Sequence, residues 1–231
     1  MMTKKIVIIG AGPGGYVGAI KAAKMGAEVT IVEKDKVGGT CLNRGCIPTK
    51  ALLASSDVLT NVKAAKDFGI MIEGEIKPDI NFMMDRKDKI VERLVNGIEF
   101  LLDKNNVKFV KGCGRIADRN HVEVIKDDNS TEELEADAII VATGSLPAQI
   151  PIFPYDGKKV IISDEALNLR EIPKNMIIVG AGVIGCEFGM FFNNLGTSIT
   201  MVEMMDHALP LEDKEIGKEM EKVSKRKKIK L

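Results

Sequence analysis

The sequence predicts an α/β fold built from two similar units, the second of which is incomplete. Three observations support this prediction. Residues 4–33 reappear in diverged form as residues 174–203, a shift of 170 positions. Each copy carries three glycines directly after an apolar run, and each places a glutamate 23 positions after the first of these glycines. One such glycine pattern is a weak signal, whereas two copies in the same surroundings are a strong one.

The first copy shows how each element follows from its residues. Residues 6–9 form an apolar run of strand length that ends at the glycines. The first glycine allows a tight turn, the second lets a pyrophosphate approach the backbone, and the third lets the following helix pack close to the strand. This order is typical of a Rossmann-like dinucleotide-binding unit, in which phosphates lie at the start of the helix. The glycines are Gly10, Gly12 and Gly15 in the first copy and Gly180, Gly182 and Gly185 in the second.

Glu33 and Glu203 end the second predicted strand of the two copies. A carboxylate at this place accepts a hydrogen bond from the 2′-hydroxyl of an adenosine ribose, and it repels a 2′-phosphate. The sequence therefore predicts two dinucleotide sites, and both should prefer a nucleotide whose adenosine ribose is not phosphorylated.

Between the copies, the hydrophobic pattern predicts helices followed by strands. Helices are expected at residues 49–66 and 82–104, strands within residues 107–124 and at residues 138–141, a turn at residues 127–130 and a linker at residues 147–157. In the second helix, four apolar residues at helical spacing predict a stripe that faces the core. They are Ile90, Leu94, Ile98 and Leu101.

Composition and charge argue against several classes of function. Hydrophobic residues make up 45% of the chain and charged residues 29%, as in ordinary globular proteins. Lys and Arg together number 33, as do Asp and Glu, so the balanced charge offers no bulk attraction to nucleic acid or to an anionic membrane. No stretch reaches the ~20 apolar residues of a membrane span. With only two histidines we expect no metal site, and the predicted location is cytoplasmic.

Cys41 and Cys46 lie five positions apart, in a segment that contains glycine and proline. In a straight helix, residues five apart rise by about 7.5 Å, whereas a disulfide needs Cα atoms within about 4.4–6.8 Å. A bridge between them therefore requires a bend, for which Gly45 and Pro48 are suitable residue types. Such a strained and accessible bridge would be labile, as thiol exchange requires. The alternative is a pair of reduced cysteines in the core.

The segment GGTCLNRGCIPTK, residues 38–50, resembles the redox-active disulfide motif of the pyridine nucleotide-disulfide oxidoreductases. Together with GPGGYVGAIKAAKMG, residues 12–26, it is most similar to the dihydrolipoyl dehydrogenase group of that family. The resemblance covers nearly the whole chain. It implies an FAD-binding domain at residues 1–146 and the N-terminal part of an NAD-binding domain at residues 147–231. The interface domain of the family is expected to be absent.

The resemblance assigns FAD to the first glycine site and NAD to the second. The flavin contacts that it implies, beside Gly10, Gly12, Gly15 and Glu33, are Lys34, Gly39, Thr40, Lys50, Gly114, Thr143, Gly144 and Ser145. The implied NAD contacts are Gly180, Gly182, Gly185, Glu187 and Glu203. In the family, the cysteine that matches Cys41 exchanges with a dithiol substrate, and the one that matches Cys46 lies against the flavin. Lys50 would approach the reactive flavin nitrogen, and Glu187 would pair with this lysine near the nicotinamide.

The reaction implied by the resemblance is the oxidation of dihydrolipoamide to lipoamide with NAD⁺. Dihydrolipoamide would reduce a Cys41–Cys46 disulfide, and the electrons would pass through Cys46 and FAD to NAD. The implied partners are a lipoyl-domain protein of a 2-oxo acid dehydrogenase or glycine cleavage complex and, as in the family homodimers, a second copy. Because chains of the family are longer, this chain alone is expected to hold FAD poorly and to be weakly active or inactive.

Two other functions remain as alternatives. One is another disulfide reductase of the family, acting on glutathione, mercuric ion or coenzyme A disulfide, although Glu203 argues against members that use NADP. The other is a non-catalytic fragment that binds a flavin or a nucleotide, which would have no need of the cysteine pair.

Several remaining polar residues are given no role in the chemistry. His207 and Glu212 have the His-x4-Glu spacing of the family's acid–base pair, but they follow the second strand of the second copy. His121 lies in a predicted strand and is expected to be structural or exposed. Cys113 and Cys186, in apolar or glycine-rich surroundings, are expected to be buried bystanders.

Overall fold

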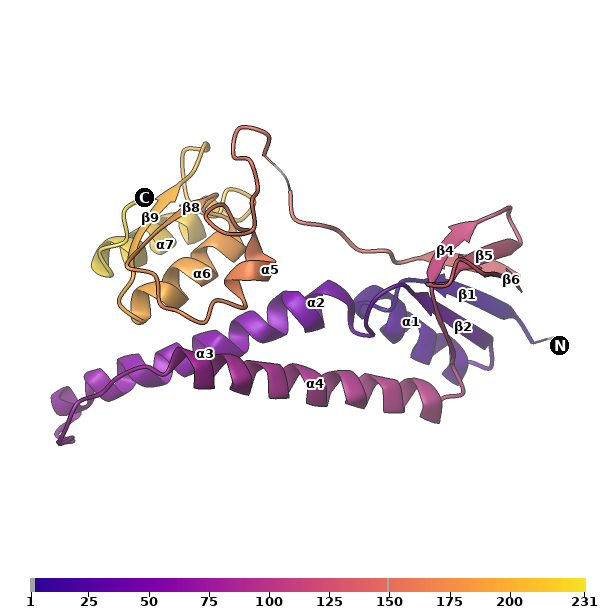
Figure 1. Cartoon of the computed structure of the whole chain (residues 1–231), viewed down its shortest axis with the longest axis horizontal. Helices are drawn as coiled ribbons and strands as arrows, with labels where there is room; N and C mark the ends of the chain where they lie inside the picture. The colour runs from indigo at the N-terminus through magenta and orange to yellow at the C-terminus, as the bar shows by residue number, and fades with distance from the viewer. Residues whose placement is uncertain (1–2, 149) are drawn as a thin grey trace. The chain divides into compact units, whose positions relative to one another are not determined.

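A computed structural model describes residues 3–148 and 150–231. Packing divides the described residues into two units (Figure 1), of which the first contains residues 3–48, 89–148 and 150 and the second contains residues 49–88 and 151–231. The linear division expected at residues 146 and 147 keeps residues 49–88 in the first domain. In the structure this segment packs with the second unit, because its apolar side chains join the core there. Residue 149 of the expected linker lies outside the described residues.

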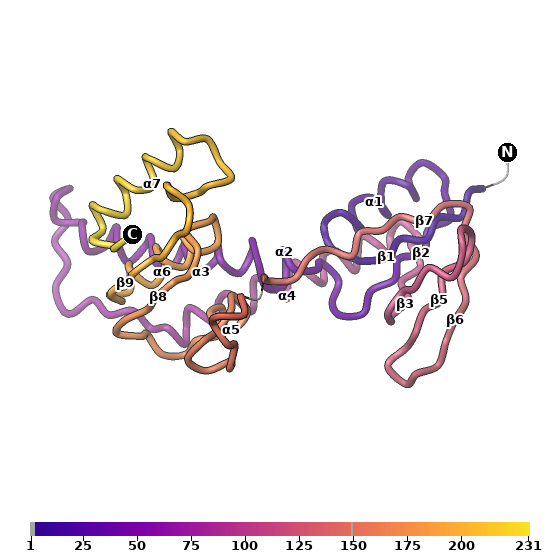
Figure 2. The backbone as a smooth tube through the Cα atoms, turned by 90° about the horizontal axis from the view of Figure 1, so that it is seen from above, coloured from indigo at the N-terminus to yellow at the C-terminus, as the bar shows by residue number. Residues whose placement is uncertain are grey.

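The first unit is built on a parallel sheet with the strand order β3-β2-β1-β7, which can be followed in Figure 2. Its strands are β1 (Lys5–Ile9), β2 (Glu28–Glu33), β3 (Lys108–Lys111) and β7 (Ala138–Val141). Helix α1 (Pro13–Lys24) connects β1 to β2, and helix α2 (Gly39–Arg44) follows β2. Ile8 of β1 is in register with Ile31 of β2 and Ile140 of β7. The predicted α/β class is confirmed.

Strand β1 is covered on both faces, which explains why its residues after Lys5 are all apolar. On one face, Ile8 packs in a core with residues of α1 and with Ile98 from the C-terminal part of helix α4 (Ile80–Lys104). On the other face, Val7 and Ile9 pack against an antiparallel sheet with the order β4-β5-β6. Its strands are β4 (Cys113–Ile116), β5 (His121–Ile125) and β6 (Thr131–Glu135).

The third glycine of each copy permits a close approach that no other residue could make. A β-carbon added to Gly15 would lie 1.8 Å from the carbonyl oxygen of Gly10. One added to Gly185 would lie 2.1 Å from the carbonyl oxygen of Gly180. Because these contacts are with backbone, no side-chain movement could relieve them. The glycines therefore let each helix pack directly on the turn that ends the preceding strand, as the repeated motif predicts.

The second unit contains the second copy of the repeat. Strands β8 (Asn175–Val179) and β9 (Ser198–Val202) pair in parallel and are joined by helix α6 (Val183–Asn194). The unit also holds α5 (Ser163–Ala166), α7 (Lys214–Arg226), most of α3 (Cys46–Lys63), the 3₁₀-helix η1 (Ala65–Phe68) and the N-terminal part of α4. On the outer side of β9, an isolated parallel bridge joins Thr200 to Lys230.

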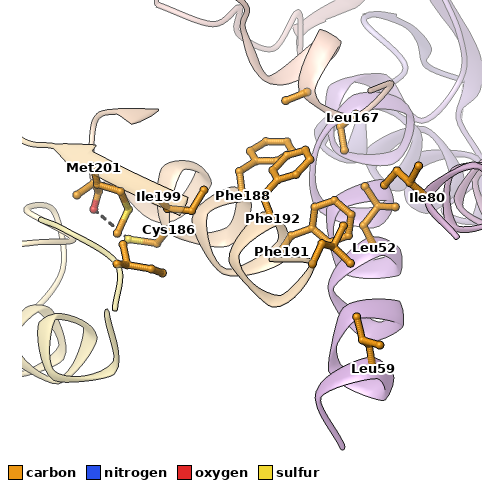
Figure 3. Packing of buried hydrophobic residues seen from close by; sticks show 14 of the residues in the cluster. Leu52, Leu59, Ile80, Leu167, Cys186, Phe188, Phe191, Phe192, Ile199 and Met201 are labelled. Atoms are coloured by element: carbon orange, nitrogen blue, oxygen red, sulfur yellow. Dashed lines mark hydrogen bonds between the residues drawn. The ribbon is translucent and has the colours of Figure 1, made fainter. Parts of the chain in front are cut away.

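Aromatic side chains of α6 form the centre of the second core. Phe191 and Phe192 are both fully buried, and their rings meet edge to face with the centroids 4.8 Å apart. Figure 3 shows these rings beside Leu52 of α3, with Ile80 of α4 nearby. Apolar contacts between α6 and the two long helices therefore explain why residues 49–88 belong to this unit.

The stripe expected along the second long helix is only partly right. Ile98 is buried as predicted, but Leu94 and Leu101 are 37% and 43% exposed, and Leu102 is buried instead. The face of α4 that meets the first core is thus turned by about one residue position. Spacing identifies an apolar face of a helix, whereas the surfaces packed against that face decide which of its residues are covered.

Among the described residues, no helix combines the length and the apolar character that a membrane crossing requires. In the same part of the chain, no cluster of three or more His, Cys, Asp or Glu side chains is arranged to hold a metal ion.

Replacing Phe191 with alanine should destabilise the second unit, because alanine leaves a cavity at a fully buried position. We expect the free energy of unfolding to fall by about 3–5 kcal/mol, as measured by denaturant unfolding of the full chain. Phe68→Ala is the matched control: this residue is 81% exposed in the same unit, and its loss should change the free energy by less than about 0.5 kcal/mol. Equal effects of the two substitutions would contradict the assignment of Phe191 to the core of the second unit.

Alanine substitutions at two glycines of α1 should change the stability of the chain in opposite directions. Gly15→Ala places a β-carbon against the Gly10 carbonyl and should destabilise the chain by about 1–3 kcal/mol or more. A β-carbon at Gly18 meets nothing within 4 Å, so Gly18→Ala should stabilise the chain by roughly 0.5–1 kcal/mol through the better helix propensity of alanine. Thermal unfolding of both variants checks this, and a stabilising Gly15→Ala would contradict the close approach.

Candidate dithiol and dinucleotide sites

The cysteines of the segment CLNRGC lie on either side of a break between two helices. Helix α2 ends at Arg44 and helix α3 begins at Cys46, with Gly45 between them. A β-carbon at Gly45 would lie 3.0 Å from the carbonyl oxygen of Thr40 and 3.2 Å from the Cα of Cys41. The chain at Gly45 therefore folds back against the preceding turn, and this is where the bend expected between the cysteines occurs.

Pro48 does not take part in the bend, contrary to the expectation from the sequence. It is the third residue of α3, where a helix has no internal partner for the missing N–H, so proline continues the helix without distortion. Cys41 is half-buried and Cys46 is exposed. Helix α2 is anchored by Leu42, which is buried in the first core, and by Asn43, whose Nδ2 donates to the Val37 carbonyl at 2.9 Å.

The first glycine turn and Glu33 form one hydrogen-bonded unit. Oε2 of Glu33 accepts the N–H of Ala11 at 2.8 Å, and Oε1 accepts the N–H of Asp35 at 2.8 Å. Gly12 is the N-cap of α1, with no capping side chain and no acidic residue in the first turn. The carboxylate thus lies beside a helix start whose amide groups can receive an anion.

The cysteine helix begins against this same turn. A β-carbon on Gly39, the first residue of α2, would lie 2.6 Å from the Cα of Gly12. On another side of the turn, a β-carbon on Gly10 would lie 2.2 Å from the carbonyl oxygen of Ala142 and 3.2 Å from the Cα of Thr143. Several of the flavin contacts that the resemblance implies therefore lie together at the carboxyl ends of β1, β2 and β7. They are Gly10, Gly12, Glu33, Gly39 and Thr143.

The remaining first-site residues have simpler positions. Lys34 and Thr40 are exposed on the loop and the helix that follow β2, and Gly144 and Ser145 are exposed after β7. Gly114 lies over the end of the sheet, since a β-carbon there would meet the Ile9 side chain at 3.0 Å.

The second glycine turn repeats the arrangement of the first. Oε2 of Glu203 accepts the N–H of Ala181 at 2.8 Å, and Oε1 accepts the N–H groups of Met204 at 2.8 Å and Met205 at 3.0 Å. The hydrogen bond from Met205, followed by that from Ala181, lowers the pKa of the Glu203 carboxyl. Gly182 caps α6 without a capping side chain. The charge of Glu203 is thereby stabilised at the end of β9.

Both turns are closed by a residue that lies outside the glycine motif. The N–H of Gly38 donates to the carbonyl of Ala11 at 2.8 Å, and the N–H of Leu209 donates to that of Ala181 at 2.8 Å. Gly38 has φ +95° and Leu209 has φ +53°. A glycine before the cysteine segment is a usable signal for such a turn. A leucine is not, because bulky residues rarely adopt positive φ.

Lys50 and Glu187 meet in the second unit. Nζ of Lys50, on α3, lies 3.0 Å from Oε1 of Glu187, on α6. The side chain of Lys50 is 62% exposed and that of Glu187 is 24% exposed. The carboxylate on the largely apolar α6 thus has a cationic partner from a different helix.

The other two cysteines differ from each other. Cys186 is buried, its Sγ donates to the Ala181 carbonyl at 3.3 Å, and burial raises the pKa of its thiol to about 11. Cys113 is exposed, which corrects the expectation that it would be buried. It begins the edge strand β4, so that one side of the strand has no neighbouring strand to cover it.

Neither histidine forms the His–Glu pair of the family, although His207 is one of the minor causes that lower the pKa of the Glu203 carboxyl. Nδ1 of His207 lies 3.0 Å from the carbonyl oxygen of Ala208, and its Nε2 lies 3.6 Å from Asp206, so neither contact involves Glu212. Nδ1 of His121 lies 2.9 Å from the carboxylate of Asp118, and this hydrogen bond is the main cause that raises the pKa of the imidazole.

Comparisons with known proteins agree on one family. The sequence matches the family described as pyridine nucleotide-disulphide oxidoreductase over residues 4–231. It is 43% identical over 214 residues to a dihydrolipoyl dehydrogenase of Bacillus subtilis, covering 92% of this chain and 46% of that protein. It is 45% identical over 232 residues to a dihydrolipoyl dehydrogenase of Acholeplasma laidlawii, covering 98% of this chain and 67% of that protein. The chain spans about half the length of several such relatives.

Solved structures lead to the same family. LpdA of Mycobacterium tuberculosis is 29% identical with a TM-score of 0.91, over 99% of this chain and 51% of that one. RclA of Escherichia coli, described as an HOCl-induced flavoprotein disulfide reductase, is 27% identical with a TM-score of 0.81, over 100% of this chain and 49% of that one. The family match, with a bent cysteine segment beside the first of two equivalent glycine turns, shows that this chain belongs to the pyridine nucleotide-disulphide oxidoreductase family.

Proposed function

We propose that this chain carries the dithiol centre and the dinucleotide sites of an NAD-dependent flavoprotein disulfide oxidoreductase that oxidises dihydrolipoamide to lipoamide. The observation that carries the proposal is the close approach of Gly39, at the start of the cysteine helix, to Gly12 of the first glycine turn. The relatives named dihydrolipoyl dehydrogenase support the choice of substrate. The partners would be a lipoyl-domain protein of a 2-oxo acid dehydrogenase or glycine cleavage complex and a second copy of the protein.

The residues of the first turn fit FAD. The uncapped start of α1 offers amide donors for the diphosphate. Each oxygen of the Glu33 carboxylate accepts one backbone N–H, which leaves further lone pairs for a ribose hydroxyl. When bound, FAD would supply the two-electron transfer between the cysteine pair and the nicotinamide.

The residues of the second turn fit NAD in the same way. Gly182 leaves the start of α6 open to the diphosphate, and Glu203 presents a stabilised negative charge where the adenosine ribose would lie. The family resemblance assigns Lys50 to the flavin and Glu187 to the nicotinamide. Their ion pair would hold the ammonium of the lysine in one place.

The cysteines would carry out thiol exchange in two steps. A substrate thiolate attacks the sulfur of Cys41, the bond between Cys41 and Cys46 breaks, and Cys46 leaves as a thiolate. The second substrate thiol then displaces Cys41 from the mixed disulfide and closes the lipoamide ring. Two electrons pass to the cysteine pair, and the protons of the substrate thiols pass to the cysteines or to solvent. The choice of Cys41 as the attacked residue rests on the resemblance, since Cys46 is the more exposed of the two.

Dihydrolipoamide added in stoichiometric amount to the oxidised full chain should open a Cys41–Cys46 bridge, and this needs no turnover. We expect both cysteines to become alkylatable only after reduction, as counted by mass spectrometry of peptides. Cys41→Ser and Cys46→Ser should each abolish the change, whereas Cys113→Ser, at an exposed position away from the segment, should preserve it. An oxidised chain whose Cys41 and Cys46 react as readily as Cys113 would rule the proposal out.

Substitution of Glu203 should alter the choice of nicotinamide nucleotide. With the first site saturated by FAD, the chain should bind NADH about tenfold more tightly than NADPH, which corresponds to ~1.4 kcal/mol. Glu203→Gln keeps an acceptor but removes the charge, so the two affinities should approach each other. Calorimetric titration measures both, with Glu212→Gln on an exposed loop as the control. An unchanged ratio in Glu203→Gln would show that this carboxylate does not face the ribose.

A further inference from the structure

An ion pair joins the cysteine helix to the loop that follows Glu33. Arg44, in the last turn of α2 between the two cysteines, pairs through Nη2 with Oδ2 of Asp35. The two side chains are 43% and 44% exposed. Asp35 lies two residues beyond Glu33, in the loop that connects β2 to α2. Neither member of this pair has a part in the function proposed above.

Asp35 is also anchored through its backbone. Its N–H donates to Oε1 of Glu33 at 2.8 Å, and its carbonyl accepts a hydrogen bond from Nζ of Lys111, on the neighbouring strand β3. The other oxygen of Glu33 accepts the N–H of Ala11 at 2.8 Å. A continuous path of polar contacts therefore runs from the first glycine turn, through Glu33 and Asp35, to Arg44 of the cysteine helix.

Residues of α2 other than Arg44 also hold this helix in place. Leu42 is buried, and Asn43 donates to the Gly39 carbonyl at 3.0 Å and to the preceding loop. Arg44 is the next residue, and it directly precedes the bend at Gly45. The pair with Asp35 thus restrains the residue from which the bend starts. Because a disulfide forms only within a narrow range of Cα separations, this restraint favours conformations in which the two cysteines can bond.

We propose that Arg44 is a positioning residue whose ion pair with Asp35 couples occupancy of the first dinucleotide site to the dithiol–disulfide equilibrium of Cys41 and Cys46. The inference rests on the proposed function, because it takes FAD as the occupant and the cysteine pair as the redox centre. Glu33, held by the ribose of FAD, would fix Asp35, and Asp35 would fix Arg44. By linkage, the bridged chain would bind FAD more tightly than the reduced chain, by the same factor as FAD favours the bridge.

The experiment measures bridge formation by the full chain in glutathione redox buffers, with and without FAD. Glutathione disulfide takes up the two electrons and two protons that the thiols lose, and alkylation with mass spectrometry gives the bridged fraction. Arg44→Met should lower the equilibrium constant about two- to five-fold, the range expected of a partly exposed ion pair. It should also reduce the shift that FAD causes. Arg44→Lys, which keeps the charge, should retain most of both effects.

Two further variants sharpen the test. Arg115→Met breaks an exposed ion pair with Glu123 in the same unit, away from the cysteine segment, and should leave the equilibrium unchanged. Asp35→Asn distinguishes loss of the ion pair from a change in net charge. Asp35→Asn and Arg44→Met change the net charge in opposite directions, but both break the pair. Both should therefore lower the equilibrium constant for bridge formation.

Opposite shifts in Asp35→Asn and Arg44→Met, or an Arg44→Met chain that behaves like Arg115→Met, would overturn the inference. A wild-type chain that forms no bridge between Cys41 and Cys46 in any of these buffers would refute the proposed function instead. The two failures are therefore distinguishable.

Discussion

The packing of helix α1 onto the turn that ends β1 is the contact on which both the fold of the first unit and its site depend. It exists because Gly15 has no side chain where the Gly10 carbonyl lies 1.8 Å from the position of a β-carbon. With the helix start held at the strand end, the Ala11 amide lies within reach of Glu33, and α2 can begin against Gly12. One steric condition thus brings a helix start without a capping side chain, the carboxylate of Glu33 and the cysteine helix to the same edge of the sheet.

The cysteine segment derives its geometry from a helix that is interrupted for a single residue. A continuous helix would hold Cys41 and Cys46 too far apart to bond. The fold places Gly45 at the interruption and the buried side chain of Leu42 before it, so one side of the break is fixed in the core. A rigid support on one side and a glycine hinge on the other would suit the thiol exchange that we propose for this pair.

Features that depend on local spacing could be predicted from the sequence. Both glycine turns, the paired glutamates and the strand at residues 138–141 follow from short-range pattern, and each is present. Features that depend on which surfaces meet could not be predicted. The exposure of Leu94 and of Cys113 is set by what covers α4 and β4, and the grouping of residues 49–88 is set by the aromatic core of α6. The Arg44–Asp35 contact has no signal in the sequence, because charged surface residues follow no period that reports their partners.

The two nucleotide turns, so alike in their hydrogen bonds, differ in how much strain the closing residue carries. Gly38 adopts its positive φ without a steric penalty, whereas the left-handed conformation of Leu209 costs on the order of 1–2 kcal/mol. Local opening of the second turn releases that strain. The free energy of opening the second turn should therefore be smaller than the free energy of opening the first. Native-state hydrogen exchange would then be faster at the Leu209 amide than at the Gly38 amide. The first turn would then be the more rigid of the two, and the second would open more easily.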